Sequence, residues 1–296
     1  MANKISLREP LGQALLHPRP FGLNEDGVAL HEIVRILFGW ADLYNEDRQT
    51  TTRLRTNILR TSNSHKGRPD KIVKMIFDNE VSVADYSKLL MTVGVRNTPF
   101  FSHLRSELVL CLLAKRNGRY TESFLYLYRI LEYISVAFPM LYALTKPDFF
   151  GSHKFLKAMM LDGKEGDLKV LRQAIPVLSR QGNLNSIVFD FDVSGMGVDQ
   201  ISSIKAELTA AVLPQVKNME FETEGDILFR VPFDDMSSLF VSVRNRMFHY
   251  KISETNINLS LVGGSEAICR ICLDELLYWF SLLYTEIIRV LGKQIV

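Results

Sequence analysis

Residues 120–135 read YTESFLYLYRILEYIS, and this stretch decides the class of fold. Its apolar character continues to about Leu144, and beyond Ser123 its only charged residues are Arg129 and Glu132. A helix that is apolar nearly all round must be buried on nearly all sides. We therefore expect a long, buried helix from residue 120 to about residue 144, at the centre of a mainly α fold.

Further segments with helical apolar spacing lie on both sides of this helix. Downstream they cover Phe233–Tyr250 and Glu266–Leu291, and directly upstream they cover Phe101–Lys115. The first hundred residues predict an irregular arm over Met1–Asp26 and then a small helical domain. Its expected helices cover Val28–Tyr44, Thr50–Thr61 and Asp70–Asp78, with one more that begins at a capping box, Ser82 to Asp85.

The pattern changes over about residues 146–231. Ile187–Val193 alternates apolar and polar residues, which indicates a strand, and Asp226–Val231 is its expected partner. A helical pattern over Val198–Leu213 lies between them. We therefore expect a small α+β insertion, in a domain that covers residues 100–296 and follows an N-terminal helical domain over residues 1–99. The joint is expected at Gly94–Pro99.

Residues 244–249 read RNRMFH and end one of the predicted helices. At about 100° per residue, Arg244, Asn245 and His249 fall within an arc of roughly 140°. These residue types suit RNA cleavage without a metal ion. Histidine can serve as base or acid near neutral pH, and arginine offers several donors to a phosphate. Asparagine can hold the histidine tautomer or bind a phosphate oxygen.

Arg244 lies in the middle of the apolar arc of its helix, so its guanidinium needs a carboxylate, a phosphate or a subunit interface. Glu132 of the long helix is a candidate partner. The alternative is a local pair between Glu132 and Arg129. The motif as a whole also has a plainer interpretation, in which Arg244 pairs with a core carboxylate and His249 only ends the helix.

The motif and its helical context resemble the HEPN family of ribonucleases, over roughly residues 100–296. The stretch 120–135 looks like the long buried helix of that family, and the motif helix and a closing helix follow in the same order. The resemblance implies an all-α bundle that pairs as a homodimer, with two RNxxxH motifs in one composite site. It also implies the catalytic residues Arg244, Asn245 and His249, and a role as a toxin or in anti-phage defence such as abortive infection.

Charge is distributed unevenly along the chain. The net charge is only +2, but residues 48–74 contain eight Lys or Arg and a single acid, Asp70. This basic segment could bind RNA phosphates, dock an acidic regulatory protein, or form an ordinary solvated face. The residues expected to contact RNA or a partner are Arg53, Arg55, Arg60, Lys66 and Arg68.

Composition argues against several other classes of function. The six histidines are spread singly, and Cys269 and Cys272 have no second pair near by, so we expect no metal site and no cofactor. The three cysteines and the absence of a secretory signal favour the cytoplasm. No apolar run reaches membrane-spanning length without charges, so no membrane association is expected.

Three functions remain open at this level. The first is a metal-independent endoribonuclease that cleaves by 2′-hydroxyl attack at a composite dimer site. The second is a catalytically silent HEPN subunit that binds RNA or acts as a scaffold in a defence complex. In the third, the N-terminal domain senses a partner and the remainder only dimerises.

Overall fold

A computed structural model describes residues 5–10, 20–23, 27–61, 68–145, 150, 153, 168–222, 227–249, 252 and 254–294. The described chain is mostly helical, with two small antiparallel sheets. It divides into two compact units, of which the first contains Met1–Leu110 and Phe280–Val296 and the second contains Cys111–Trp279. The sequence predicted the joint between domains at Gly94–Pro99, whereas the two units divide after Leu110. At Gly94–Pro99 the π-helix η1 (Leu90–Gly94) is followed closely by α4 (Thr98–Arg116).

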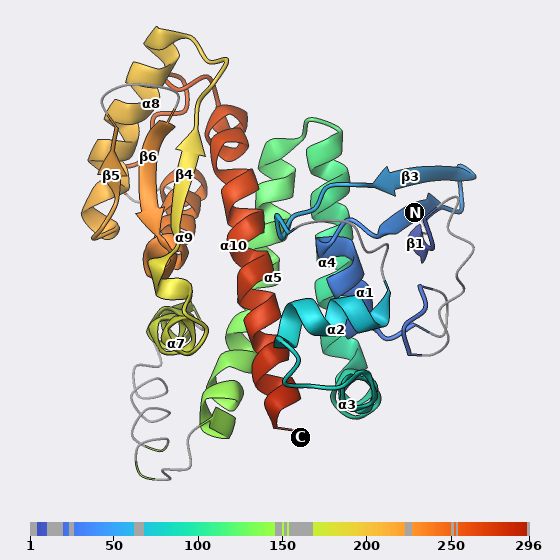
Figure 1. Ribbon diagram of the computed structural model, residues 1–296. Coiled ribbons are helices and arrows are strands. Elements are labelled where there is room, and N and C mark those ends of the chain that lie inside the picture. The colour runs from blue at the N-terminus through green and yellow to red at the C-terminus, as the bar shows by residue number, and fades with distance from the viewer. Residues whose placement is uncertain are drawn as a thin grey trace. The chain divides into compact units, whose positions relative to one another are not determined.

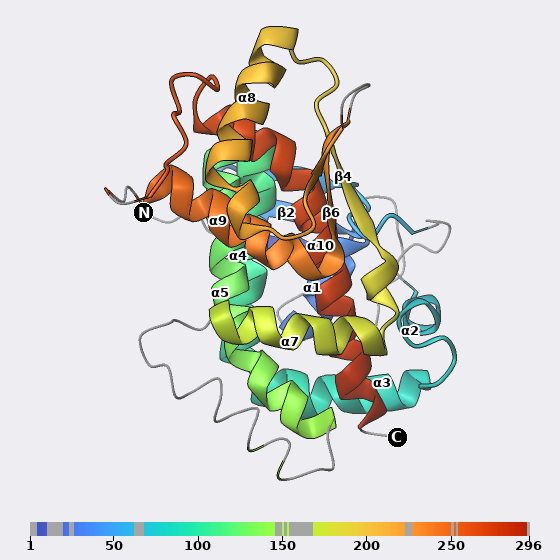
Figure 2. The same cartoon turned by 90° about the vertical axis from the view of Figure 1, so that its left-hand side faces the viewer.

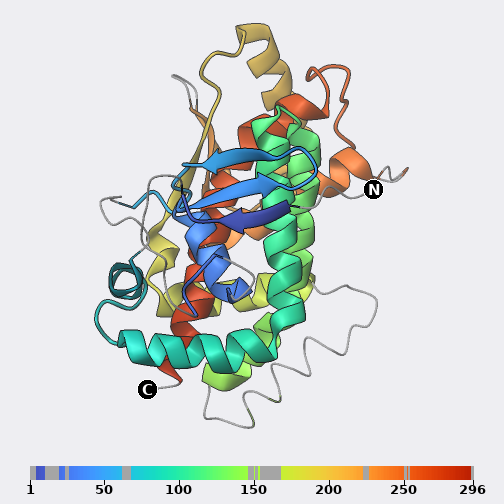
Figure 3. The same cartoon turned by 90° about the vertical axis from the view of Figure 1, so that its right-hand side faces the viewer.

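The first unit combines a three-stranded sheet with several helices, and α4 and α10 contribute residues to both units. The strand order is β1-β2-β3, and both pairings are antiparallel. Figure 3 shows this sheet with α1 next to it. The elements are β1 (Ile5–Arg8), α1 (Ala29–Leu37), β2 (Ala41–Asn45), β3 (Thr50–Leu54), α2 (Pro69–Phe77), α3 (Val83–Leu89), η1, α4 and the end of α10 (Ser265–Lys293).

The sheet overturns three expectations for the N-terminal region. β1 lies within the expected irregular arm, and β3 occupies the start of the expected helix over Thr50–Thr61. The expected helix over Val28–Tyr44 ends at Leu37, and β2 follows. Gly39 causes this break, because it has a φ of +71° and a Cβ there would lie 2.9 Å from a backbone oxygen of Thr56.

Two other expectations for this unit are confirmed. The helix predicted over Asp70–Asp78 is α2. The capping box is also present, because the Ser82 hydroxyl accepts from the Asp85 amide at 3.1 Å while the Asp85 carboxylate accepts from the Ser82 amide at 3.3 Å.

Helix α1 is buried along its whole length although it carries three polar side chains, His31, Glu32 and Arg35. His31 Nδ1 is hydrogen-bonded to the Tyr86 hydroxyl at 3.1 Å, and Glu32 is paired with Arg105. Burial raises the pKa of Glu32, and Arg105 opposes that rise only in part. The helix is therefore held by specific polar contacts as well as by apolar packing.

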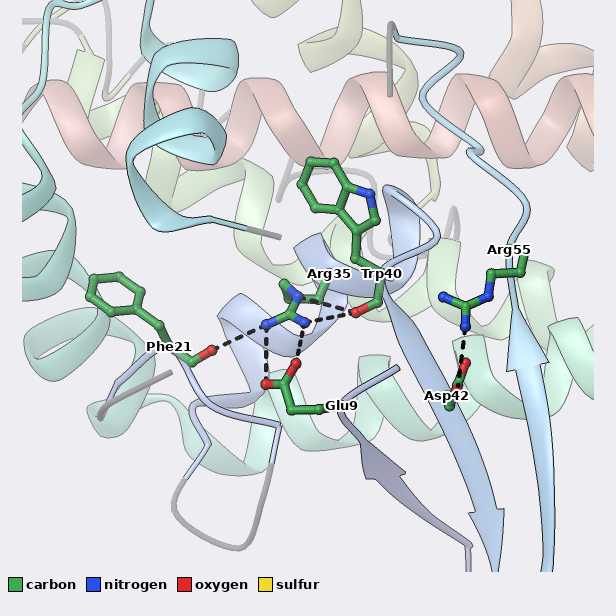
Figure 4. Close-up of polar contacts among 6 residues, drawn as sticks. All are labelled: Glu9, Phe21, Arg35, Trp40, Asp42 and Arg55. Carbon is green, nitrogen blue, oxygen red and sulfur yellow. Dashed lines mark hydrogen bonds and ion pairs between the residues drawn. The ribbon is translucent and has the colours of Figure 1, made fainter. Parts of the chain in front are cut away.

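Arg35 has 0% of its side chain exposed and is surrounded by acceptors, as Figure 4 shows. Its two terminal nitrogens donate to the carboxylate of Glu9, the shorter bond being 2.7 Å. Nε and Nη2 both donate to the backbone oxygen of Trp40, and Nη1 donates to that of Phe21. These contacts join Glu9, which directly follows β1, and Phe21 to the C-terminal end of α1.

The second unit contains the long helix predicted from residue 120 and the predicted insertion. Its elements are the end of α4, α5 (Tyr120–Thr145), α7 (Leu168–Gln181), η2 (Leu184–Ser186), β4 (Val188–Asp192), α8 (Val198–Ala211), η3 (Leu213–Gln215), β5 (Glu220–Phe221), β6 (Ile227–Pro232), η4 (Phe233–Asp235), α9 (Met236–Phe248) and the start of α10. Of the expected insertion, residues 146–149, 151–152, 154–167 and 223–226 lie outside the described part of the chain.

The predicted pair of strands is confirmed. β4 and β6 are antiparallel neighbours, β5 adds to the other side of β6, and α8 lies along this sheet (Figure 1). Alternation along β4 buries Phe189 and Phe191 and exposes Val188, Asp190 and Asp192. Phe191 stacks on Phe229 of β6 with 4.3 Å between ring centroids, which fixes the apolar face of the sheet.

The cysteines are buried thiols. Burial raises the pKa of Cys269 to about 12, and it raises that of Cys272 as well, so both stay protonated at neutral pH. Within the described residues, no cluster of His, Cys, Asp or Glu could hold a metal ion. None of the helices in the described part of the chain has the length and hydropathy that a membrane span requires.

Candidate active site

The motif residues lie at the C-terminal end of α9. Arg244 and Asn245 belong to its last turns, and His249 is the residue that caps it. The His249 amide donates to the Asn245 backbone oxygen at 3.0 Å, and its own backbone is extended, so the helix ends there. The His249 side chain is exposed, whereas those of Arg244 and Asn245 are half-buried.

Arg244 is held by an aromatic ring and an amide. Its guanidinium carbon lies 4.6 Å from the centroid of the Tyr128 ring, and Nη1 donates to Asn245 Oδ1 at 3.0 Å. A cation over the face of a tyrosine ring is attracted by the electron density of that face. Arg244 therefore has partners suited to a half-buried cation, and no carboxylate of the described residues is one of them.

Tyr128 comes from α5 and was not identified from the sequence. Its side chain is 5% exposed, and its ring meets that of Phe240 edge to face at 5.5 Å. Burial raises the pKa of Tyr128; Arg244 and Arg172 oppose this rise, and Glu132 adds to it. The phenol therefore stays neutral around neutral pH. The only signal in the sequence was the place of Tyr128 one turn before Glu132 on the predicted central helix.

Helices α5, α7 and α9 build this environment. The rings of Phe124 and Tyr128 on α5 both meet Phe240 of α9, at 4.8 Å and 5.5 Å. Figure 2 shows α7 crossing beside α5, with α9 next to α7. Arg172 of α7 is close enough to act electrostatically on Tyr128. The motif end of α9 is thus seated on aromatic side chains of the long helix.

Glu132 does not pair with Arg244. Its side chain is exposed on α5, and among the described residues no ion pair joins it to Arg244. A half-buried guanidinium keeps part of its hydration, so it does not require a carboxylate as a fully buried one would. Glu132 instead acts on the neighbouring phenol of Tyr128.

Asn245 orients the arginine rather than the histidine. Its side-chain oxygen accepts from Arg244, and no side-chain hydrogen bond of His249 occurs among the described residues. Asn245 and His249 are one turn apart at the end of α9, as their spacing in the sequence predicts. An exposed imidazole and a fixed guanidinium at the same helix end are the group types that proton transfer next to an anion requires.

The loop after the motif is anchored at several points. Arg246 pairs with Glu254, and its backbone oxygen accepts from the amide of Ile257 at 3.1 Å. The amide of Asn258 donates to Glu207 Oε2 of α8 at 2.7 Å. Helix α8 therefore fixes the loop that follows the candidate catalytic residues.

The basic segment is divided among several elements of the first unit. Arg53 is exposed on β3, Arg55 follows that strand, and Arg60 is exposed with a φ of +54°. Arg68 is engaged by Asp70, with two bonds of 3.0 and 3.1 Å. Lys66 lies outside the described residues.

The register of the sheet adds residues that the sequence did not indicate. Asp42 of β2 is opposite Arg8 on one side and Arg53 on the other, and it also lies 3.8 Å from Arg55 (Figure 4). Arg8 lies over the ring of Tyr44, 3.2 Å from its centroid. This row of arginines around a buried carboxylate forms the basic face of the first unit.

In comparisons with protein-family models, with curated protein sequences and with solved structures, no match to this chain was found. A function is therefore proposed from the chemistry and geometry at the end of α9.

Proposed function

We propose that this chain is an endoribonuclease that cleaves RNA by attack of a 2′-hydroxyl on the adjacent phosphate. The observation that carries the proposal is Arg244, held on Tyr128 and bonded to Asn245, at the same end of α9 that the exposed His249 caps. A fixed cation and an exposed acid–base group at one helix end match the needs of this reaction. The resemblance of RNxxxH to HEPN ribonucleases supports the same conclusion.

The reaction is balanced by two proton transfers. The bond from O2′ to phosphorus forms while a base removes the proton of the 2′-hydroxyl, and the bond from phosphorus to O5′ breaks while an acid protonates O5′. The products are a 2′,3′-cyclic phosphate and a 5′-hydroxyl. Arg244 would stabilise the charge that develops on the phosphate oxygens, and His249 would carry one of the proton transfers.

A single copy of the motif supplies one histidine for two proton transfers. We propose that two copies meet in a homodimer, so that separate histidines act as base and acid. A biological setting in anti-phage defence or as a toxin, in the cytoplasm, follows from the family resemblance alone. A stable monomer with full activity in sedimentation would remove the dimer from this proposal.

The basic segment, residues 48–74, is proposed as the part of the first unit that contacts the RNA backbone or an acidic regulatory protein. Arg53, Arg55 and Arg60 are exposed and suit this role. Arg68 is exposed as well and is paired with Asp70. No contact with bases is assigned to these residues.

The test is RNA cleavage by the purified protein in the presence of EDTA. His249→Ala should reduce the rate by about 10²–10⁴-fold, because a positioned acid or base contributes that much. His103→Ala is the matched control, since His103 is another exposed histidine, on α4, and the rate should not change. Wild-type products should end in 2′,3′-cyclic phosphate.

Two outcomes would contradict the mechanism: full activity in His249→Ala, or activity lost on chelation. A protein that binds RNA without cutting it would instead favour the catalytically silent, RNA-binding or scaffolding subunit.

A further inference from the structure

The contact between Tyr128 and Arg244 gives Tyr128 a role in the proposed site. We propose that Tyr128 is a positioning residue, which holds the guanidinium of Arg244 so that its unused N–H groups receive a phosphodiester. The identity of this ligand rests on the ribonuclease function proposed above. The role of Tyr128 rests on the geometry of α5 and α9.

The donors of Arg244 are only partly used by the protein. Of the five N–H groups of a guanidinium, one on Nη1 is donated to Asn245 at 3.0 Å. Among the described residues, no other side chain or backbone oxygen accepts from Arg244, and its side chain is half-buried. A planar fork with free donors matches two oxygens of a phosphate group.

Tyr128 restricts the motion of this fork. Its ring occupies the space on one side of the guanidinium, 4.6 Å from the central carbon, and Asn245 fixes one end. A free arginine side chain has several rotatable bonds, and ordering them on binding costs affinity. Here the ring and the amide order them in advance, so a phosphate meets a guanidinium that is already in place.

Tyr128 is itself well fixed. It is 5% exposed on the long helix α5, and its ring packs edge to face against Phe240, one turn before Arg244 on α9. Burial keeps the phenol protonated, so the ring does not become a phenolate that would neutralise Arg244. Arg172 of α7 and Glu132 of α5 also act on this phenol, with opposite signs.

The first measurement uses the wild-type protein without any ligand. The Nε–H proton of Arg244, assigned in side-chain ¹H–¹⁵N spectra by comparison with Arg244→Lys, should be shifted upfield by the ring of Tyr128. Tyr128→Phe should keep the shift, and Tyr128→Leu should lose it. Tyr126→Leu is the matched control, because Tyr126 is a tyrosine of the same helix whose hydroxyl donates to Glu122.

The second measurement is the affinity for a 2′-deoxy dinucleotide, which carries a phosphodiester but cannot be cleaved by 2′-hydroxyl attack. Tyr128→Leu should weaken binding about tenfold, and Tyr128→Phe should bind like the wild type. In cleavage assays, Tyr128→Leu should raise KM more than it lowers kcat.

The outcomes separate this inference from the proposed function. If the protein cuts no RNA but the dinucleotide binds in a manner dependent on Tyr128, the ribonuclease proposal fails and the role of Tyr128 stands. If the protein cuts RNA and Tyr128→Leu binds the dinucleotide as tightly as the wild type, the role of Tyr128 is overturned. An unshifted Arg244 resonance in the wild type overturns it even if Tyr128→Leu does not fold.

Discussion

Arg35 on α1 and Arg244 on α9 are both arginines in apolar helices, but they differ in how many of their N–H donors the protein uses. Arg35 has no exposed side-chain surface, and its donors are taken by Glu9, Trp40 and Phe21. Arg244 is half-buried, donates once to Asn245 and rests on an aromatic ring. Arg35 has no unused N–H donor for a ligand, whereas Arg244 is an ordered cation with unused donors that can bind an anion.

The comparison shows that burial of a charge is by itself a poor indicator of function. Four acceptor oxygens surround Arg35 because every N–H that is removed from water needs an acceptor. Arg244 needs fewer, because part of its surface remains hydrated. The number of unused donors, rather than the apolar surroundings, distinguishes a candidate ligand-binding arginine from a structural one.

The largest effect is expected from removing the charge at the two positions. Arg35→Met should lower the free energy of unfolding by about 3–5 kcal/mol, because it leaves the carboxylate of Glu9 and two backbone oxygens without their donor. Arg244→Met should cost only about 1 kcal/mol, the scale of a cation–π contact. Urea denaturation of the two variants measures the difference. Equal losses would show that Arg244 is as structural as Arg35.

A second substitution tests whether the plane of the guanidinium matters. Arg244→Lys keeps the charge but loses the planar fork, so RNA cleavage should fall about 10²-fold while the free energy of unfolding changes by less than about 1 kcal/mol. Arg35→Lys should show the reverse, a loss of stability with unchanged activity per folded molecule. Cleavage rates normalised to the folded fraction report both effects. Full activity in Arg244→Lys would show that only the positive charge of Arg244 is needed, and not its planar guanidinium.

The smallest effect is expected from Glu32, the other buried charge of α1. Its pKa in the folded protein is raised above the ordinary value of 4.5, mainly by burial. Folding therefore favours the protonated carboxyl, and this contribution to stability is complete below pH 4.5 and is lost as the pH rises through the raised pKa. Glu32→Gln should flatten this decline between pH 4.5 and neutrality.

Glu80 is the control for this pH dependence, because its pair with Lys293 lowers its pKa. Glu80→Gln should remove a dependence of opposite sign, in which stability is lost as the pH falls below 4.5. A Glu32→Gln profile parallel to that of the wild type would contradict the assignment.

The sequence predicted the helices that carry the candidate site better than it predicted the sheet of the first unit. Helices α5, α9 and α10 have long apolar patterns, and these identify a helix without knowledge of its neighbours. The apolar run from Val28 to Tyr44 contains both α1 and β2, and periodicity alone does not separate a buried helix from a buried strand.

The candidate site was also predicted only in part. Arg244, Asn245 and His249 follow from one contiguous motif, so the sequence identifies them directly. Tyr128 reaches Arg244 from a helix far earlier in the chain, and only the packing of α5 on α9 brings them together. Glu132 was chosen because it is a charge on the buried helix, but it lies one turn further along α5, on an exposed surface.

The anchoring of the loop after α9 has a consequence for the order of events during folding. Its amide at Asn258 and its oxygen at Val262 are bound by Glu207 and Gln200 of α8, in contacts that span 51 and 62 residues of chain. Contacts over such separations form slowly, because the intervening chain must first be closed into a loop. The loop that follows His249 is thus completed only after α8 has folded. For the proposed ribonuclease, this order would keep the active site incomplete until the chain has been synthesised at least as far as Val262.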